Sequence, residues 1–98
     1  MLDFKMASQE EIAKALAQRL RAHRLTKNLK QGDLAARAGI SVGTVKNLES
    51  SGQASIETLI RIVIALDLTQ DLNTLFETKA RSIAQMEQME FPVRQRAR

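Results

Sequence analysis

Apolar residues recur along most of the chain at helical spacing. The Ser-x-x-Glu pattern formed by Ser8 and Glu11 is a capping box, so the first helix is predicted to begin there. Ile12, Leu16 and Leu20 follow at intervals of four residues with Ala13 and Ala17 beside them, which predicts one apolar face along that helix. The same interval leads to Arg24, and an arginine on a covered face requires an acidic partner.

Two short helices joined by a glycine turn are predicted next. Asn28 can adopt the left-handed conformation that ends the first helix. Residues 31–38 have helix-forming composition and are followed by Gly39, a common residue at the end of a helix. Ser41 can then cap a further helix over residues 42–50. This arrangement is the helix-turn-helix pattern, whose second helix enters the major groove of DNA.

The helix expected after Ser41 has two different sides. At 100° per residue, one side carries Thr44, Val45 and Leu48, which would anchor the helix to the domain. The opposite side would be free to contact a ligand, and it carries Val42, Gly43, Lys46, Asn47 and Ser50.

The remaining chain predicts two more helices and an extension. Ser55 can cap a helix over residues 56–66, whose apolar residues cover an arc of about 200°, wider than the stripe of an ordinary surface helix. Asp67 would end it, and Thr69 can cap a fifth helix. We expect a domain over 8–76, a helical extension over 77–91 and an arginine-rich tail over 92–98. The residues expected to contact a second subunit or a partner are Ile64, Leu72, Phe76, Ile83 and Met86.

Positive charge is concentrated on the predicted helix-turn-helix. The whole chain of 98 residues carries a net charge of +4. Residues 19–47 contain seven Lys or Arg and one acidic residue, so that stretch is +6 and the rest is about −2. This distribution favours a polyanionic partner, with a solvated basic face as the alternative.

Composition excludes several kinds of site. The absence of cysteine excludes disulfides and thiolate metal sites. The sequence has no glycine-rich phosphate loop, metal-ligand cluster or catalytic triad, so we expect no cofactor, no metal and no enzymatic activity. His23, the only histidine, is interpreted as a surface residue. No apolar run approaches the length of a membrane span and no signal peptide is visible.

Three motifs together resemble the lambda-repressor-like (Cro/XRE) helix-turn-helix family over roughly residues 16–76. They are Leu20-Arg21-x-x-Arg24, Gln31-x-x-Leu34-Ala35-x-x-x-Gly39-Ile40-Ser41 and Val45-x-x-Leu48-Glu49. The resemblance implies an all-α fold of five helices with the third in the major groove of double-stranded DNA.

The resemblance also implies residue roles. Base-facing positions would be Ser41, Val42, Gly43, Lys46 and Asn47. Gln31 and Thr44 would face the DNA backbone. From their charge or position, the further predicted phosphate contacts are Arg19, Arg21, Lys27, Lys30 and Ser50, with solvated helix charges as the alternative for Arg19 and Arg21. Arg24 and Glu49 match a structural ion pair of relatives. Many relatives carry glutamine or arginine where Val42 and Gly43 stand, so direct base readout would depend on Lys46 and Asn47.

The predicted function is a sequence-specific DNA-binding regulator, most simply a homodimeric repressor on a palindromic operator. A narrower similarity to HipB-type antitoxins implies a HipA-type kinase toxin as a further partner. A module that mainly sequesters a partner protein, with DNA binding secondary, is the alternative. A bacterial cytoplasmic protein, associated with the nucleoid when bound to DNA, is expected.

Overall fold

The structure is a computed structural model that describes residues 2–78, and within that range it is entirely helical. Its four α-helices are α1 (Gln9–Thr26), α2 (Gln31–Ala38), α3 (Val42–Ser51) and α4 (Ile56–Ala65). Two short 3-10 helices flank them, η1 (Phe4–Met6) and η2 (Thr69–Leu72). The predicted all-α class is confirmed. None of the helices in residues 2–78 is long and apolar enough to cross a membrane.

Serine side chains begin three of the four α-helices. Ser8 Oγ accepts a hydrogen bond from the Glu11 backbone N–H at 3.1 Å, and Glu11 Oε1 accepts one from the Ser8 N–H at 2.8 Å. Ser41 and Ser55 each cap their helix through the N–H three residues later, at 3.1 Å. The predicted starts of α1, α3 and α4 are therefore confirmed, because a local cap satisfies N–H groups that have no partner inside the helix.

Residues with positive φ end these helices. Asn28 and Asp67 have φ of 57° and 62°, so both predicted helix ends are confirmed. Gly39 (φ 71°) closes α2, and Gly52 (φ 78°) closes α3. A side chain at Gly52 would have no room, because its Cβ would lie 2.6 Å from the backbone carbonyl carbon of Ala13.

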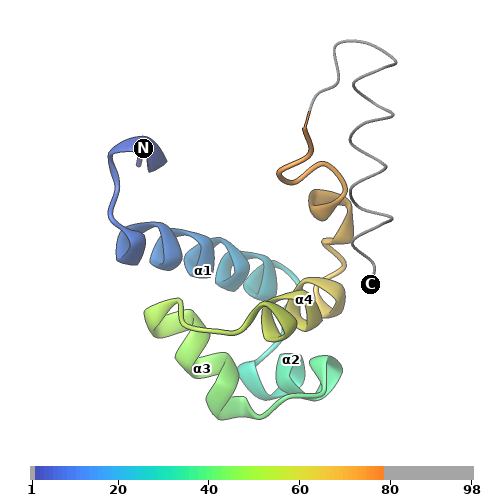
Figure 1. The fold of residues 1–98 in the computed structure, drawn as a ribbon. Coiled ribbons are helices and arrows are strands. Elements are labelled where there is room, and N and C mark those ends of the chain that lie inside the picture. The colour runs from blue at the N-terminus through green and yellow to red at the C-terminus, as the bar shows by residue number, and fades with distance from the viewer. Residues whose placement is uncertain (1, 79–98) are drawn as a thin grey trace, which may run out of the picture.

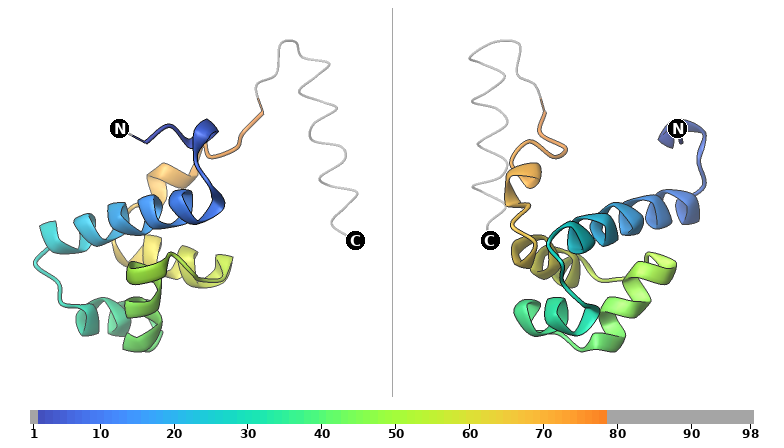
Figure 2. Two further views of the ribbon diagram at one scale, coloured as in Figure 1. Left: turned by 90° about the vertical axis from the view of Figure 1, so that its left-hand side faces the viewer. Right: turned by 180° about the vertical axis from the view of Figure 1, so that it is seen from behind.

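The core lies between α3 and its two neighbours α1 and α2, and α4 adds to it by packing against α2. Figures 1 and 2 show α1 lying along one side of the domain, with α2 and α3 on the other side, and α3 contacts both α1 and α2 while α2 contacts α4. Its largest fully buried side chains are Leu34, Val45, Ile62 and Leu66. Aliphatic residues thus supply the core, as the composition requires.

The inward face of α1 includes only part of the predicted stripe. Leu16 is 42% exposed, and Ile12 is only half-buried. Ala17 and Arg24 are the buried residues of the helix, so the covered face is rotated towards the small side chains. On this face α1 approaches the end of α3 closely, since a Cβ at Gly52 would lie 2.8 Å from the Cβ of Ala13.

A single 3-10 turn replaces the predicted fifth α-helix. Leu68 precedes η2 without a side-chain cap, and Thr69 lies inside the turn. Phe76 has φ of 60°, which interrupts any helix there. Leu75 and Phe76 are 52% and 91% exposed, so within residues 2–78 they gain little of the packing that normally stabilises a short helix. The expected extension over 77–91 and tail over 92–98 lie outside the described residues, apart from 77 and 78.

Candidate nucleic-acid interface

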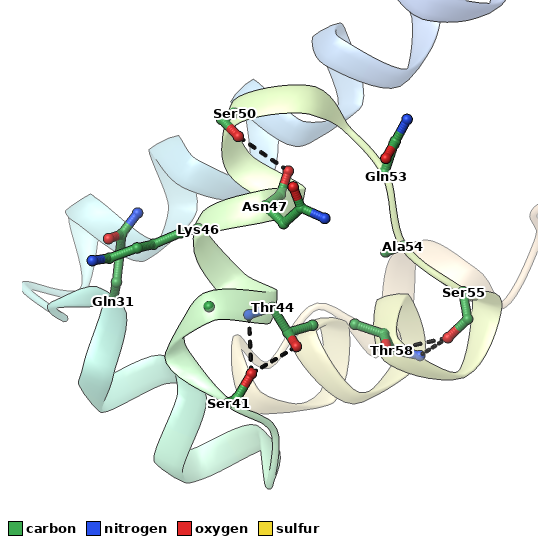
Figure 3. Close-up of a pocket in the computed structure, with 11 residues that line it drawn as sticks. Gln31, Ser41, Thr44, Lys46, Asn47, Ser50, Gln53, Ala54, Ser55 and Thr58 are labelled. Carbon is green, nitrogen blue, oxygen red and sulfur yellow. Dashed lines mark hydrogen bonds between the residues drawn. The ribbon is translucent and has the colours of Figure 1, made fainter.

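The two sides of α3 have separate roles in the structure. Val45 is fully buried, and Leu48 and Glu49 are buried beside it. Lys46 and Asn47 are exposed and project from the opposite side, towards solvent (Figure 3). The helix therefore uses one side to hold the domain and leaves the other available to a ligand.

An open hollow lies along the exposed side of α3, between α3 and the start of α4 (Figure 3). Its volume, about 870 Å³, is within the range of small-molecule sites, but such sites are lined mainly by apolar side chains. Most of the residues that line this one are polar: Gln31, Ser41, Gly43, Thr44, Lys46, Asn47, Ser50, Gln53, Ala54, Ser55 and Thr58. Such a lining suits the polar surface of a macromolecule. Residues 2–78 contain no group of metal-ligating side chains able to hold an ion.

A buried ion pair supports this surface from behind. Arg24 Nε lies 2.7 Å from Glu49 Oε2, and Arg24 Nη2 donates to Glu49 Oε1 at 2.9 Å. Arg24 Nη1 also donates to the Leu29 carbonyl at 2.7 Å. Both charged residues are 6% exposed. The two-point contact fixes the end of α1 against the end of α3, and it supplies the acidic partner that Arg24 requires.

The electrostatics of this pair favour its charged form. Burial by itself would raise the pKa of the Glu49 carboxyl. Hydrogen bonds from Arg24 and Gln31, together with the charges of Arg24 and Arg21, outweigh burial and hold that pKa below its ordinary value. The Glu49 hydrogen bond raises the pKa of Arg24. Glu49 is therefore ionised at neutral pH.

Seven of the sequence-predicted contact residues come together around the hollow. They come from the start of α2, the turn and α3: Gln31, Ser41, Gly43, Thr44, Lys46, Asn47 and Ser50. Val42 stands 42% exposed at the first position of α3. Lys27 and Lys30 are exposed on the connection before α2. The helix-turn-helix pattern therefore predicted a set of residues that share one surface.

Arg19 and Arg21 lie on different sides of α1. Two residues apart on an α-helix, they are separated by about 160° around its axis. Arg21 is close enough to Glu49 to lower its pKa, so it lies on the side of α3. The Arg19 guanidinium lies 5.1 Å from the centre of the Phe4 ring, a cation–π contact with the η1 segment. Figure 2 shows η1 beyond α1, away from α2 and α3, so Arg19 does not share the hollow.

Sequence reasoning missed several contributors to this site. Gln53, Ala54, Ser55 and Thr58 also line the hollow, although only the capping role of Ser55 was identified. Gln31 Nε2 donates to Glu49 Oε1 at 3.0 Å, which joins a predicted DNA-facing residue to the ion pair. No sequence pattern within one helix reports such a contact, because the two residues are 18 positions apart.

The comparison with known families agrees with this geometry. Residues 20–71, about half of the chain, match the HTH_3 family model, described as helix-turn-helix. The chain therefore belongs to the Cro/C1-type (XRE) helix-turn-helix family, and the predicted resemblance is confirmed. Its helix-turn-helix makes it a DNA-binding regulator of that family. Among curated proteins, none matches the chain.

Proposed function

We propose that the chain is a homodimeric transcriptional repressor that binds a palindromic operator, with α3 of each subunit in the major groove. Two-fold symmetry would place the half-sites about one helical turn of DNA apart. The proposal implies a bacterial cytoplasmic protein associated with the nucleoid.

One observation carries the proposal, namely the division of α3 into a buried and an exposed side. Val45, Leu48 and Glu49 anchor the helix, while Lys46 and Asn47 project into an open polar hollow. A base edge in the major groove offers hydrogen-bonding groups to such side chains, and phosphates attract the lysine charge. The exposed Lys27 and Lys30 on the connection before α2 would supply affinity, and Lys46 and Asn47 would supply base selection.

The dimer is supported by an exposed apolar stripe on α4. Ile56, Ile60 and Ile64 are 74%, 40% and 60% exposed, and their spacing of four residues aligns them on one face. Three adjacent isoleucines in water favour an association that covers them. Of the expected contact residues, Ile64 and Phe76 are exposed and Leu72 is half-buried. Ile83 and Met86 lie outside the described residues.

A selection experiment tests the DNA role. The full chain would enrich binding sites from a random DNA pool, and enrichment of one palindromic sequence is the expected result. Lys46→Ala should then cost about 1–3 kcal/mol at one operator position and relax base choice there. Lys5→Ala is the matched control, because Lys5 is an exposed lysine in η1, beyond α1 from the hollow (Figure 2). Recovery of no preferred sequence would contradict the proposal.

In a second candidate function, a partner protein binds the exposed apolar stripe of α4. The similarity to HipB-type antitoxins suggests a HipA-type kinase toxin as that partner, with the DNA face and the partner face on one molecule. Co-purification of the chain from its host would discriminate, since a stoichiometric kinase supports the antitoxin role. Recovery of the chain as a dimer without any partner favours the stand-alone repressor.

A further inference from the structure

Gln31 is fixed by the buried ion pair rather than free in solvent. Its Nε2 donates to Glu49 Oε1 at 3.0 Å, the same oxygen that accepts from Arg24 Nη2 at 2.9 Å. Glu49 is 6% exposed and its other oxygen accepts from Arg24 Nε. The carboxylate is thereby held in one orientation by the core, and it holds the Gln31 side chain in turn.

This contact determines which way the Gln31 amide faces. An ionised carboxylate accepts hydrogen bonds and donates none, so the NH₂ group of Gln31 must face Glu49 and its carbonyl oxygen must face away. Gln31 also lines the hollow beside α3, together with Lys46 and Asn47 (Figure 3). One N–H and the carbonyl oxygen are thus left to meet whatever occupies the hollow.

An amide that offers one acceptor and one donor is matched to a base edge better than to a phosphate. Phosphate oxygens only accept hydrogen bonds, so they would leave the Gln31 carbonyl unmatched. Adenine presents the N7 acceptor and the N6 amino donor side by side in the major groove, which is the complement of a glutamine amide. Because Glu49 holds the amide before DNA arrives, little side-chain freedom is lost on binding.

We propose that Glu49 is a positioning residue for DNA recognition, holding the Gln31 amide so that it reads an adenine at the edge of the operator half-site. The proposal rests on the DNA-binding function above and changes the expected role of Gln31 from phosphate contact to base contact. The ion pair then has two consequences, one for the fold and one for sequence choice.

The first test uses Gln31→Met, which removes both amide groups and keeps the length of the side chain. Affinity is measured against the selected operator and against a series with one base pair changed at a time. The expected result is that the variant loses about tenfold in affinity for the operator and becomes indifferent at one A·T pair. Equal weakening on every sequence would assign Gln31 to the phosphates and overturn the proposal. Failure of the wild-type chain to select any operator would refute the proposed function instead.

The second test addresses Glu49 directly. Glu49→Gln keeps the shape of the residue but no longer imposes one orientation on Gln31, so the preference at that A·T pair should fall several-fold. Arg24→Lys is the matched control: it loosens the hold on the carboxylate but keeps the acceptor oxygens that select the orientation of the Gln31 amide, so the preference should fall by less than in Glu49→Gln. A retained preference in Glu49→Gln would overturn the proposal, and so would an equal loss of preference in Arg24→Lys.

If Glu49→Gln does not fold, the hydrogen exchange of the Gln31 side-chain amide protons with solvent in the wild-type chain tests the proposal instead. One of the two protons should exchange slowly with solvent in the free protein, and both should exchange slowly in the operator complex. Rapid exchange of both protons in the free protein would overturn the proposal.

Discussion

Replacement of Gly52 by alanine should be the most destabilising glycine substitution in the domain. Gly52 has φ of 78°, a conformation that costs a residue with a side chain about 1–2 kcal/mol. The new Cβ would lie 2.6 Å, 2.7 Å and 2.8 Å from the backbone carbon, backbone oxygen and Cβ of Ala13. Because two of these atoms are backbone, α1 must shift against α3, and such overpacking typically costs about 1–3 kcal/mol.

Together these two effects predict a loss of about 2–5 kcal/mol for Gly52→Ala, a large part of the stability of a small domain. Two matched substitutions separate the causes. Gly39→Ala has a similar φ of 71°, but its nearest atom is the flexible Arg61 guanidinium at 3.3 Å, so only the backbone cost of about 1–2 kcal/mol should appear. Gly32→Ala, inside α2 with no atom within 4 Å, should stabilise by about 0.5–1 kcal/mol.

Urea denaturation followed by circular dichroism measures this series, since the chain has no Trp or Tyr for fluorescence. The slope of the unfolding free energy against urea should be the same for all four proteins, so that midpoints report stability. A Gly52→Ala midpoint equal to that of Gly39→Ala would refute the claim that α1 leaves no room for a side chain at Gly52.

Two further predictions concern the ion pair and the exposed stripe. The folded-state pKa of Glu49 is lowered, so its stabilisation is fully present above the unfolded pKa of about 4.3 and is lost as the pH falls through the folded value. The stability difference between wild type and Glu49→Gln in urea should therefore stay constant from about pH 6 to 8 and shrink below about pH 4; a difference that grows in acid would contradict this sign. Ile60→Glu should convert the proposed dimer to a monomer in sedimentation, while the monomer keeps the helical circular dichroism spectrum of wild type. An unchanged dimer would exclude the α4 stripe as the interface.

Local signals in the sequence predicted most of the helix boundaries correctly. Ser8, Ser41 and Ser55 each bond to an N–H three residues away, so the information for a helix start lies within one turn of the chain. Asn28 and Asp67 likewise end α1 and α4 through their own backbone conformation. Such signals do not depend on how the helices pack.

Features that depend on packing could not be predicted in this way. The exposure of Leu16 depends on how α1 packs against the rest of the domain, and helix periodicity does not specify that packing. The segment after α4 forms only a 3-10 turn, and Leu75 and Phe76 pack little against the other residues of 2–78. In the candidate site, periodicity and family resemblance predicted the residues of α3, whereas the bond from Gln31 to Glu49 became visible only in three dimensions.

The separation of the two sides of α3 bears on how such a regulator can diverge. The exposed side contributes little to the core, and a side chain at Gly43 would meet only the Ser41 hydroxyl, at 3.8 Å. On the proposed function, a single substitution at Val42, Gly43 or Asn47 would change operator preference without a compensating change elsewhere. Gene duplication followed by drift at these positions would give paralogues with distinct targets. Gln31 is the exception, since its side chain is bonded to Glu49, a residue that is tied to the core.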